Sequence, residues 1–150
     1  MTKKTFTILL VLIILSGCTS NQSKNSSPKE ADITQISTKK ATNQDASNQA
    51  KQSLKKYNEV TSIVAVNTTK KVVVGVNVHQ KNRFHLKSLR KKWKSKLKKS
   101  LPKMDISVTT DQKIIWELTD LETRLKETSM SKKDLQKKLK KIIKLMNENA

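Results

Sequence analysis

Two β-branched runs joined by five polar residues constrain the fold of this chain most strongly. The runs are Val60–Val66 (VTSIVAV) and Val72–Val78 (VVVGVNV), and Asn67–Lys71 (NTTKK) connects them. Such runs are typical of β-strands, and the connection has the length and polarity of a hairpin loop. In the second run the even-numbered valines share one face, while Gly75 on the other face indicates a β-bulge or a close helix contact. The pattern predicts an antiparallel hairpin.

Four further segments carry apolar residues every three or four positions, which is the period of an amphipathic helix. They are Asn48–Tyr57, Asn82–Ser100, a helix capped by Asp111 that runs to Lys126, and a helix that begins after Ser131, whose spacing to Asp134 resembles a capping box. A third strand is predicted over Met104–Thr109. The order α-β-β-α-β-α-α predicts an α/β (α+β) fold, with a small three-stranded sheet, helices on one face and a C-terminal amphipathic helix.

The N-terminus has the features of a bacterial lipoprotein signal peptide. Lys3 and Lys4 precede ten uncharged residues, Phe6–Leu15, a run too short to span a bilayer as a helix. Leu15-Ser16-Gly17-Cys18 then resembles a lipobox, in which the cysteine is acylated and the chain is cut before it. We therefore expect a signal peptide over residues 1–17 and a lipidated Cys18. The alternatives are an ordinary cleaved signal that leaves a free thiol, and a buried core cysteine.

The composition divides the rest of the chain into three parts. Residues 18–47 are rich in Ser, Thr, Asn, Gln and Lys and predict a disordered polar tether with a reach of roughly 30 Å. Residues 48–128 are expected to form the α/β domain, and residues 129–150 the basic C-terminal helix. Lipidation would fix the mature protein to the outer face of the cell membrane, because two or more acyl chains give stable attachment.

The net charge of +20 implies an acidic partner. Eleven basic residues and no acid lie between Lys81 and Lys103. The residues that we expect to bind the anionic partner are Lys87, Arg90, Lys91, Lys94, Lys98 and Lys99. Anionic lipid headgroups and phosphate polymers of the envelope are both compatible, and the alternative is a solvated outer helix face. Nucleic acid is a poor candidate, because an exported, tethered protein rarely meets it and Trp93 lacks neighbouring aromatic residues for stacking.

The terminal helix leaves three alternatives open. It is basic and amphipathic, so it could lie in a membrane interface, pack on the domain or pair with a protein partner. Trp116 falls off the apolar stripe of the preceding helix, where either exposure or edge packing is expected.

The sequence gives little support for catalysis or for a cofactor. His79 and His85 are the only histidines, and a zinc site would need further ligands. The carboxylates Glu117, Asp120 and Glu122 have capping and ion-pair explanations, such as Glu122 with Lys126 four positions later. We therefore predict no enzyme activity, no metal and no cofactor.

Several of these features together resemble a known family. The lipobox, the polar tether, VTSIVAVNTTKKVVVGVNV, an amphipathic helix, and ISVTTD followed by a helix are similar to the YhcN/YlaJ-type sporulation lipoproteins of endospore-forming bacteria. The resemblance covers the signal and about Asn48–Thr128. It implies a domain similar to BON domains, a setting at the spore inner membrane, and a role in spore formation, germination or outgrowth. It implies no catalytic residues.

The expected function is that of a membrane-anchored lipoprotein whose basic domain binds or organises an anionic partner at the outer face of the membrane. The alternative is a structural or assembly factor that binds a protein through its C-terminal helix.

Overall fold

The computed structural model describes residues 31–35, 43–128 and 130–148. Its elements are β1 (Asp32–Ile33), α2 (Asp45–Lys55), β2 (Val60–Asn67), β3 (Lys71–Val78), the 3-10 helix η2 (Gln80–His85), α3 (Leu86–Ser100), β4 (Asp105–Thr109), α4 (Gln112–Glu127) and α5 (Lys132–Glu148). The signal peptide over residues 1–17 and Cys18 lie outside the described residues, so what we expect of them stays a prediction.

The sheet contains four strands in the order β1-β2-β3-β4. The predicted hairpin of β2 and β3 is confirmed, and β1 and β4 run parallel to their neighbours. The prediction of three strands is wrong, because Asp32 and Ile33 pair with Ser62 and Ile63 and add a fourth. A two-residue strand is too short to show an alternating pattern, so the polar composition around it gave no sign of β1.

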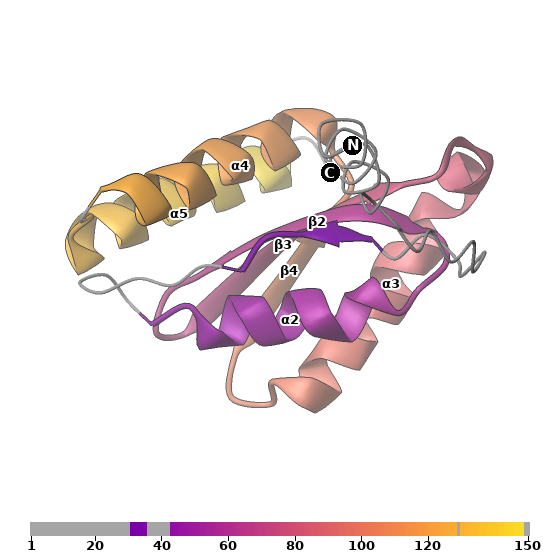
Figure 1. Ribbon diagram of the computed structural model, residues 1–150, viewed down its shortest axis with the longest axis horizontal. Helices are drawn as coiled ribbons and strands as arrows, with labels where there is room; N and C mark the ends of the chain where they lie inside the picture. The colour runs from indigo at the N-terminus through magenta and orange to yellow at the C-terminus, as the bar shows by residue number, and fades with distance from the viewer. Residues whose placement is uncertain (1–30, 36–42, 129, 149–150) are drawn as a thin grey trace, which may run out of the picture.

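Helices cover both faces of the sheet, which corrects the prediction of helices on one face. Figure 1 shows α2 and α3 on one side of the strands and α4 and α5 on the other. The even-numbered valines Val72, Val74 and Val76 pack with α2 and α3 in one core cluster. Val73 packs with α4 and α5 in a second cluster. A strand that is apolar on both faces requires cover on both, which explains the three-layer arrangement.

Gly75 makes a close helix contact and not a bulge. A Cβ atom at this position would lie 2.8 Å from Ile115 Cγ1 and 2.9 Å from Val64 Cγ1. The irregularity in the hairpin register lies elsewhere, between Val60 and Ser62. The absence of a side chain at position 75 therefore lets α4 approach β3.

Both C-terminal helices begin at the predicted caps. The Asp111 side chain accepts a hydrogen bond from Ile114 N at 3.1 Å, and Ser131 Oγ accepts one from Asp134 N at 3.1 Å. The apolar stripe of α5 packs against α4 and the sheet, and its buried members are Leu135, Leu139 and Ile142. Of the three alternatives for the terminal helix, the structure shows packing on the domain.

A buried ion pair joins the two helix layers at the outer edge of β2. Lys51 Nζ of α2 lies 2.8 Å from Glu122 Oε1 of α4, and the two side chains are 0% and 6% exposed. Lys51 also donates a hydrogen bond to the carbonyl oxygen of Thr34, next to β1. Burial lowers the pKa of Lys51 and outweighs the hydrogen bond and charge of Glu122, which raise it. The predicted pair of Glu122 with Lys126 is also present, at 3.3 Å.

Candidate anion-binding surface

Helix α3 carries a buried apolar stripe on one side, and its lysines lie on the rest of its surface. The stripe predicted from the sequence is confirmed, with Leu89, Trp93 and Leu97 buried and Leu86 half-buried. Trp93 is fully buried and packs edge-on against Tyr57, with 6.5 Å between the ring centroids. This packing fixes the rotation of α3 and therefore the direction in which its lysines point.

The six residues predicted to bind an anionic partner are all exposed. Among the residues that the structure describes, none of the six pairs with a carboxylate. A helix turns about 100° per residue, so five of them share one side of α3. We call these five the cationic flank: Lys87, Arg90, Lys91, Lys94 and Lys98. Lys99 falls on the opposite side, so the structure separates it from the others.

A groove with a volume of 580 Å³ runs along the cationic flank. Its walls come from α3, the C-terminal end of β4, the start of α4 and the end of α5. Four members of the flank line it, and Val108 and Met146 contribute apolar surface. We call it the β4 groove. The sequence did not predict it, because it forms where the end of α5 meets the start of α4, and no local pattern encodes that contact.

Lys92 lies outside the cationic flank and already has partners. Its Nζ is 3.2 Å from Glu59 Oε1 and 4.6 Å from the centroid of the Tyr57 ring. Burial acts to raise the pKa of Glu59. Hydrogen bonds from its own backbone and from Lys92, together with the charge of Lys92, outweigh burial, so the pKa is lowered. Because Lys92 forms an ion pair with Glu59, this lysine supports the fold.

Among the described residues, two large aromatic side chains are exposed. Trp116 on α4 is 66% exposed, which agrees with its place off the apolar stripe, and Phe84 in η2 is 92% exposed. Phe84 lies between Arg83 and Lys87, at the N-terminal end of the cationic flank. Sequence reasoning missed Phe84, although its position outside the 86-89-93-97 stripe was a usable signal.

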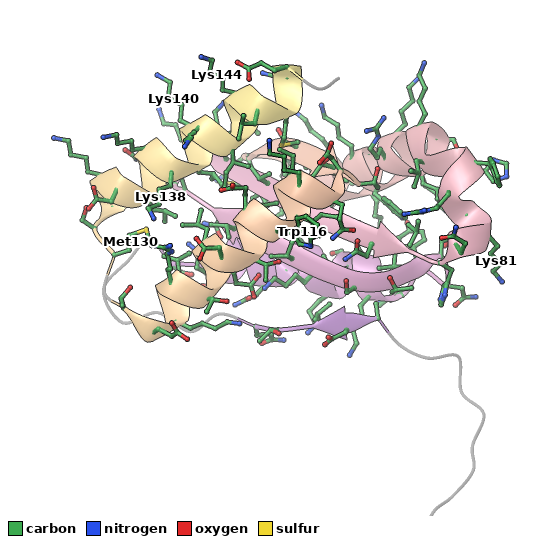
Figure 2. The ribbon with its side chains drawn as sticks, turned by 90° about the horizontal axis from the view of Figure 1, so that it is seen from above. Lys81, Trp116, Met130, Lys138, Lys140 and Lys144 are labelled. Atoms are coloured by element: carbon green, nitrogen blue, oxygen red, sulfur yellow. The ribbon has the colours of Figure 1, made fainter. Side chains whose placement is uncertain are left out.

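The basic helices α3 and α5 cover opposite faces of the sheet, but both lie on the side of the domain away from β1. Figure 2 shows α5 and α3 along one long side and β1 along the opposite side, with Lys140 and Lys144 projecting outward from α5. Both lysines are exposed. Because the apolar stripe of α5 faces inward, any partner of this helix would meet its lysines.

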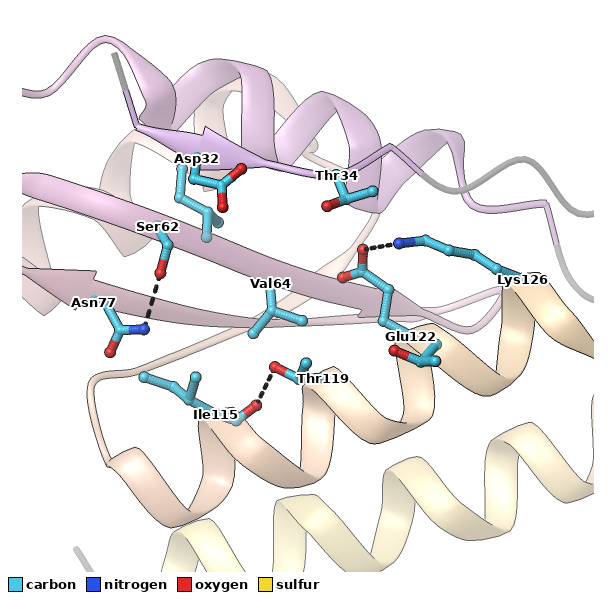
Figure 3. Close-up of a pocket in the computed structure, with 11 residues that line it drawn as sticks. Asp32, Thr34, Ser62, Val64, Asn77, Ile115, Thr119, Glu122 and Lys126 are labelled. Atoms are coloured by element: carbon cyan, nitrogen blue, oxygen red, sulfur yellow. Dashed lines mark hydrogen bonds and ion pairs between the residues drawn. The ribbon is translucent and has the colours of Figure 1, made fainter. Parts of the chain in front are cut away.

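A smaller hollow of 240 Å³ lies between β1, β2 and α4 (Figure 3). Its polar groups largely satisfy one another. Asn77 Nδ2 donates to Ser62 Oγ at 2.9 Å, Thr119 Oγ1 donates to a backbone carbonyl of α4, and Glu122 is held by two lysines. This engagement leaves few groups that could turn toward a ligand.

The described part of the chain offers no arrangement for metal binding. His79 and His85 are exposed, and no group of three or more His, Cys, Asp or Glu side chains that could hold a metal ion occurs in residues 31–35, 43–128 and 130–148. The cationic flank and the β4 groove thus combine exposed cations that have no carboxylate partner among the described residues with a concave surface.

Comparison with known protein families agrees with the arrangement along the chain. The family model described as Sporulation lipoprotein YhcN/YlaJ matches residues 17–147, which include the lipobox cysteine and all the described residues except Glu148. The chain belongs to this family. No curated protein and no solved structure gives a match, so the expected similarity of this sporulation lipoprotein to BON domains stays a prediction.

Membership in a lipoprotein family implies attachment to a membrane. In the residues described for this sporulation lipoprotein, no helix is both long enough and apolar enough to cross a bilayer. The match begins at residue 17, directly before Cys18.

Proposed function

We propose that this sporulation lipoprotein is anchored through a lipidated Cys18 and that its cationic flank binds anionic lipid headgroups. The anchor would hold it at the outer face of the cell membrane or of the spore inner membrane, with a role in spore formation or germination. The observation that carries the proposal is the cationic flank, whose five exposed members have no carboxylate partner among the described residues.

The exposed Phe84 favours a lipid surface over a soluble phosphate polymer. Aromatic side chains beside basic residues insert at the boundary between the lipid headgroups and the acyl chains. A phosphate polymer has no apolar layer into which such a side chain could insert. Phe84 is 92% exposed and lies three positions before Lys87, the first member of the cationic flank. A polymer would gain from the lysines alone.

Vesicle binding in a salt series tests the proposal. Full-length protein, held in nanodiscs of phosphatidylcholine, is mixed with vesicles and sedimented. The test vesicles contain phosphatidylglycerol, and the control vesicles contain phosphatidylcholine alone. We expect binding to the phosphatidylglycerol vesicles at low salt and its loss near 1 M salt, where the screening length is only about 3 Å. No binding at low salt would refute the proposal, and capture of polyphosphate without vesicle binding would assign the surface to a polymer instead.

A matched pair of variants tests the role of the cationic flank. Each lysine near an anionic surface contributes about 1 kcal/mol, so Lys87→Gln with Lys94→Gln should weaken vesicle binding about 30-fold at low salt. The control is Lys96→Gln with Lys99→Gln, which removes the same charge from the opposite side of α3 and should weaken binding by about threefold or less. Equal losses from the two pairs would contradict a role specific to the cationic flank.

A further inference from the structure

The chain enters the described fold at the end of the sheet where β2 begins and β3 ends. Strand β1 runs parallel to β2, and Asp32 pairs with Ser62 near the start of β2. Val60 pairs with Val78, the last residue of β3, so all three strands share this end. We call it the entry end. The turn between β2 and β3 lies at the opposite end, about 26 Å away for a strand of eight residues.

The 3-10 helix η2 lies at the entry end, because it begins two residues after the end of β3. The backbone holds its base, with His79 N donating to Glu59 O at 3.1 Å and Asn82 N donating to His79 O at 2.9 Å. None of its six residues is buried, and Phe84 belongs to neither core cluster. The helix therefore adds little to the core and presents an aromatic side chain to the solvent.

Basic side chains surround Phe84. A 3-10 helix has three residues per turn, so Lys81 lies on the same side of η2 as Phe84. Both are exposed, and Figure 2 shows Lys81 at the outer end of the domain. Arg83 and Lys87 are also exposed, and η2 and α3 contain no acidic residue. Asp32 is an exposed carboxylate at the start of β1, and these cations outnumber it.

A short stretch of chain links the entry end to Cys18. Within the predicted tether, β1 takes residues 32 and 33 into the sheet, so the twelve residues 19–30 separate Cys18 from Ala31. A coil of this length has a mean reach of about 20 Å. That is less than the length of the sheet. A lipid anchor at Cys18 would therefore hold the entry end closer to the membrane than the far turn.

We propose that η2 inserts Phe84 into the same membrane leaflet that holds the lipidated Cys18, and so docks the domain with its entry end on the bilayer. The inference rests on the proposed function, because the cationic flank would bring α3 to the anionic headgroups. It goes further by naming the inserted side chain, the end of the domain that faces the membrane and the membrane that is bound. Phe84 would enter the boundary between headgroups and acyl chains, and the cations beside it would stay among the phosphates.

The size of η2 favours a bilayer over a protein partner. A stable protein interface buries about 800 Å² on each partner around an apolar centre. The residues of η2 other than Phe84 are polar or charged, so one side chain would have to supply that centre. A bilayer needs only the single side chain, and the anchor keeps its lipids at a high effective concentration beside the entry end.

Quenching of tryptophan fluorescence by brominated lipids tests the insertion. Full-length protein with Phe84→Trp and Trp116→Phe is placed in nanodiscs of phosphatidylglycerol with brominated acyl chains. The control protein carries Thr69→Trp instead of Phe84→Trp, at an exposed position in the far turn. We expect quenching and a blue shift of the emission for the tryptophan at position 84, and neither for the one at position 69. The buried Trp93 is common to both proteins and cancels in the comparison.

Moving the brominated lipids to separate vesicles tests which membrane is bound. The protein then stays in phosphatidylglycerol nanodiscs without bromine, and the vesicles carry the quencher. Docking on its own bilayer predicts that quenching at position 84 is lost in this arrangement. Quenching by the vesicles as strong as that within the disc would show that η2 binds a second membrane, and would overturn the inference.

Replacement of Phe84 gives an independent readout. Phe84→Ser should weaken binding of phosphatidylglycerol vesicles to the protein in phosphatidylcholine nanodiscs by about tenfold or more, because burial of a phenylalanine side chain contributes at least that factor. Phe84→Leu should restore most of the binding. The control Trp116→Ser removes an exposed aromatic side chain from α4 and should leave binding unchanged. Circular dichroism checks that each variant folds, and equal losses from the two serine variants would contradict a role specific to η2.

The outcomes separate this inference from the lipid-surface proposal. Vesicle binding that depends on the cationic flank, without quenching at position 84, would overturn insertion and leave headgroup binding intact. Equal quenching at positions 69 and 84 would overturn the docking orientation. Quenching at position 84 that persists in phosphatidylcholine and at high salt would support insertion and refute the role of anionic headgroups. Absence of both quenching and vesicle binding would overturn both proposals.

Discussion

The ion pair of Lys51 and Glu122 provides the sharpest test of how the two helix layers are held together. Glu122→Gln keeps the shape of the side chain but removes the charge that faces a fully buried ammonium group. Removing one partner of a buried pair typically destabilises a protein by about 3–5 kcal/mol. Lys51 keeps the Thr34 carbonyl as an acceptor, so we expect a loss near 3 kcal/mol. That is a large share of a typical unfolding free energy of about 5–15 kcal/mol.

A double variant separates the contribution of the Lys51–Glu122 ion pair from the cost of leaving one buried charge without a partner. Lys51→Met combined with Glu122→Gln removes both charges, and the glutamine oxygen remains available to Ala65 N, which donates to Glu122 in the native chain. Exchange of a buried pair for uncharged residues is often neutral, so the double variant should lie within about 1 kcal/mol of the native protein. Urea unfolding followed by the fluorescence of the buried Trp93 measures each value. A loss below about 1 kcal/mol for Glu122→Gln, or a double variant that is less stable than Glu122→Gln alone, would refute this reasoning.

The same pair predicts a pH dependence. The pKa of Lys51 in the folded chain is lowered by burial, so above that pKa the unfolded chain binds more protons than the folded one. The stability of the native protein relative to Lys51→Met should therefore rise as the pH increases from the folded-state pKa toward the ordinary lysine value of 10.5. Urea midpoints of the two proteins over this range provide the measurement, and a constant difference between them would contradict the lowered pKa.

Three further predictions concern other parts of the molecule. Gly75→Ala should lower the unfolding free energy by about 1–3 kcal/mol in urea titrations, because the new methyl group would overlap Ile115; an unchanged midpoint would show that α4 can move aside. Lys92→Met should raise the pKa of Glu59 in an NMR titration of its side-chain carboxyl, since the lysine bond and charge that lower this pKa are lost, whereas an unaltered titration would assign the shift to the backbone alone. Cys18→Ser should abolish the mass of the lipid group in intact-mass analysis and release the protein from membranes at high salt; retention in the membrane fraction would contradict anchoring at this residue.

The sequence was sufficient to predict the elements with strong local patterns. The hairpin, the apolar stripe of α3 and the caps at Asp111 and Ser131 depend on residues that are neighbours in the chain, and all were confirmed. The second covered face was visible as Val64 and Val66 of β2 and Val73 of β3, which all pack toward α4 and α5. Apolar residues on both faces of these strands favour cover on both faces, which the prediction of helices on one face overlooked.

The features that could not be predicted depend on contacts between distant residues. Glu122 was assigned to Lys126 by helix spacing, but its buried partner Lys51 lies 71 positions away along the chain. The β4 groove likewise needs the antiparallel packing of α4 and α5, which brings the end of α5 to the start of α4. The six predicted cations were found from charge alone, and applying the helical period of about 100° per residue to the same segment would have shown that Lys99 stands apart.

The position of β1 determines where mechanical force would enter the molecule. Among the described elements β1 lies nearest the N-terminus, so a pull from an N-terminal membrane attachment would reach it before the others. It is held by two residue pairs with β2 and, through Thr34, by Lys51. These few bonds should yield before the hairpin or the helices do. Detachment of β1 would move the first remaining attachment of the fold to α2, twelve residues further along the chain, which is up to about 40 Å of extended backbone, so the domain could move outward from the bilayer while still folded.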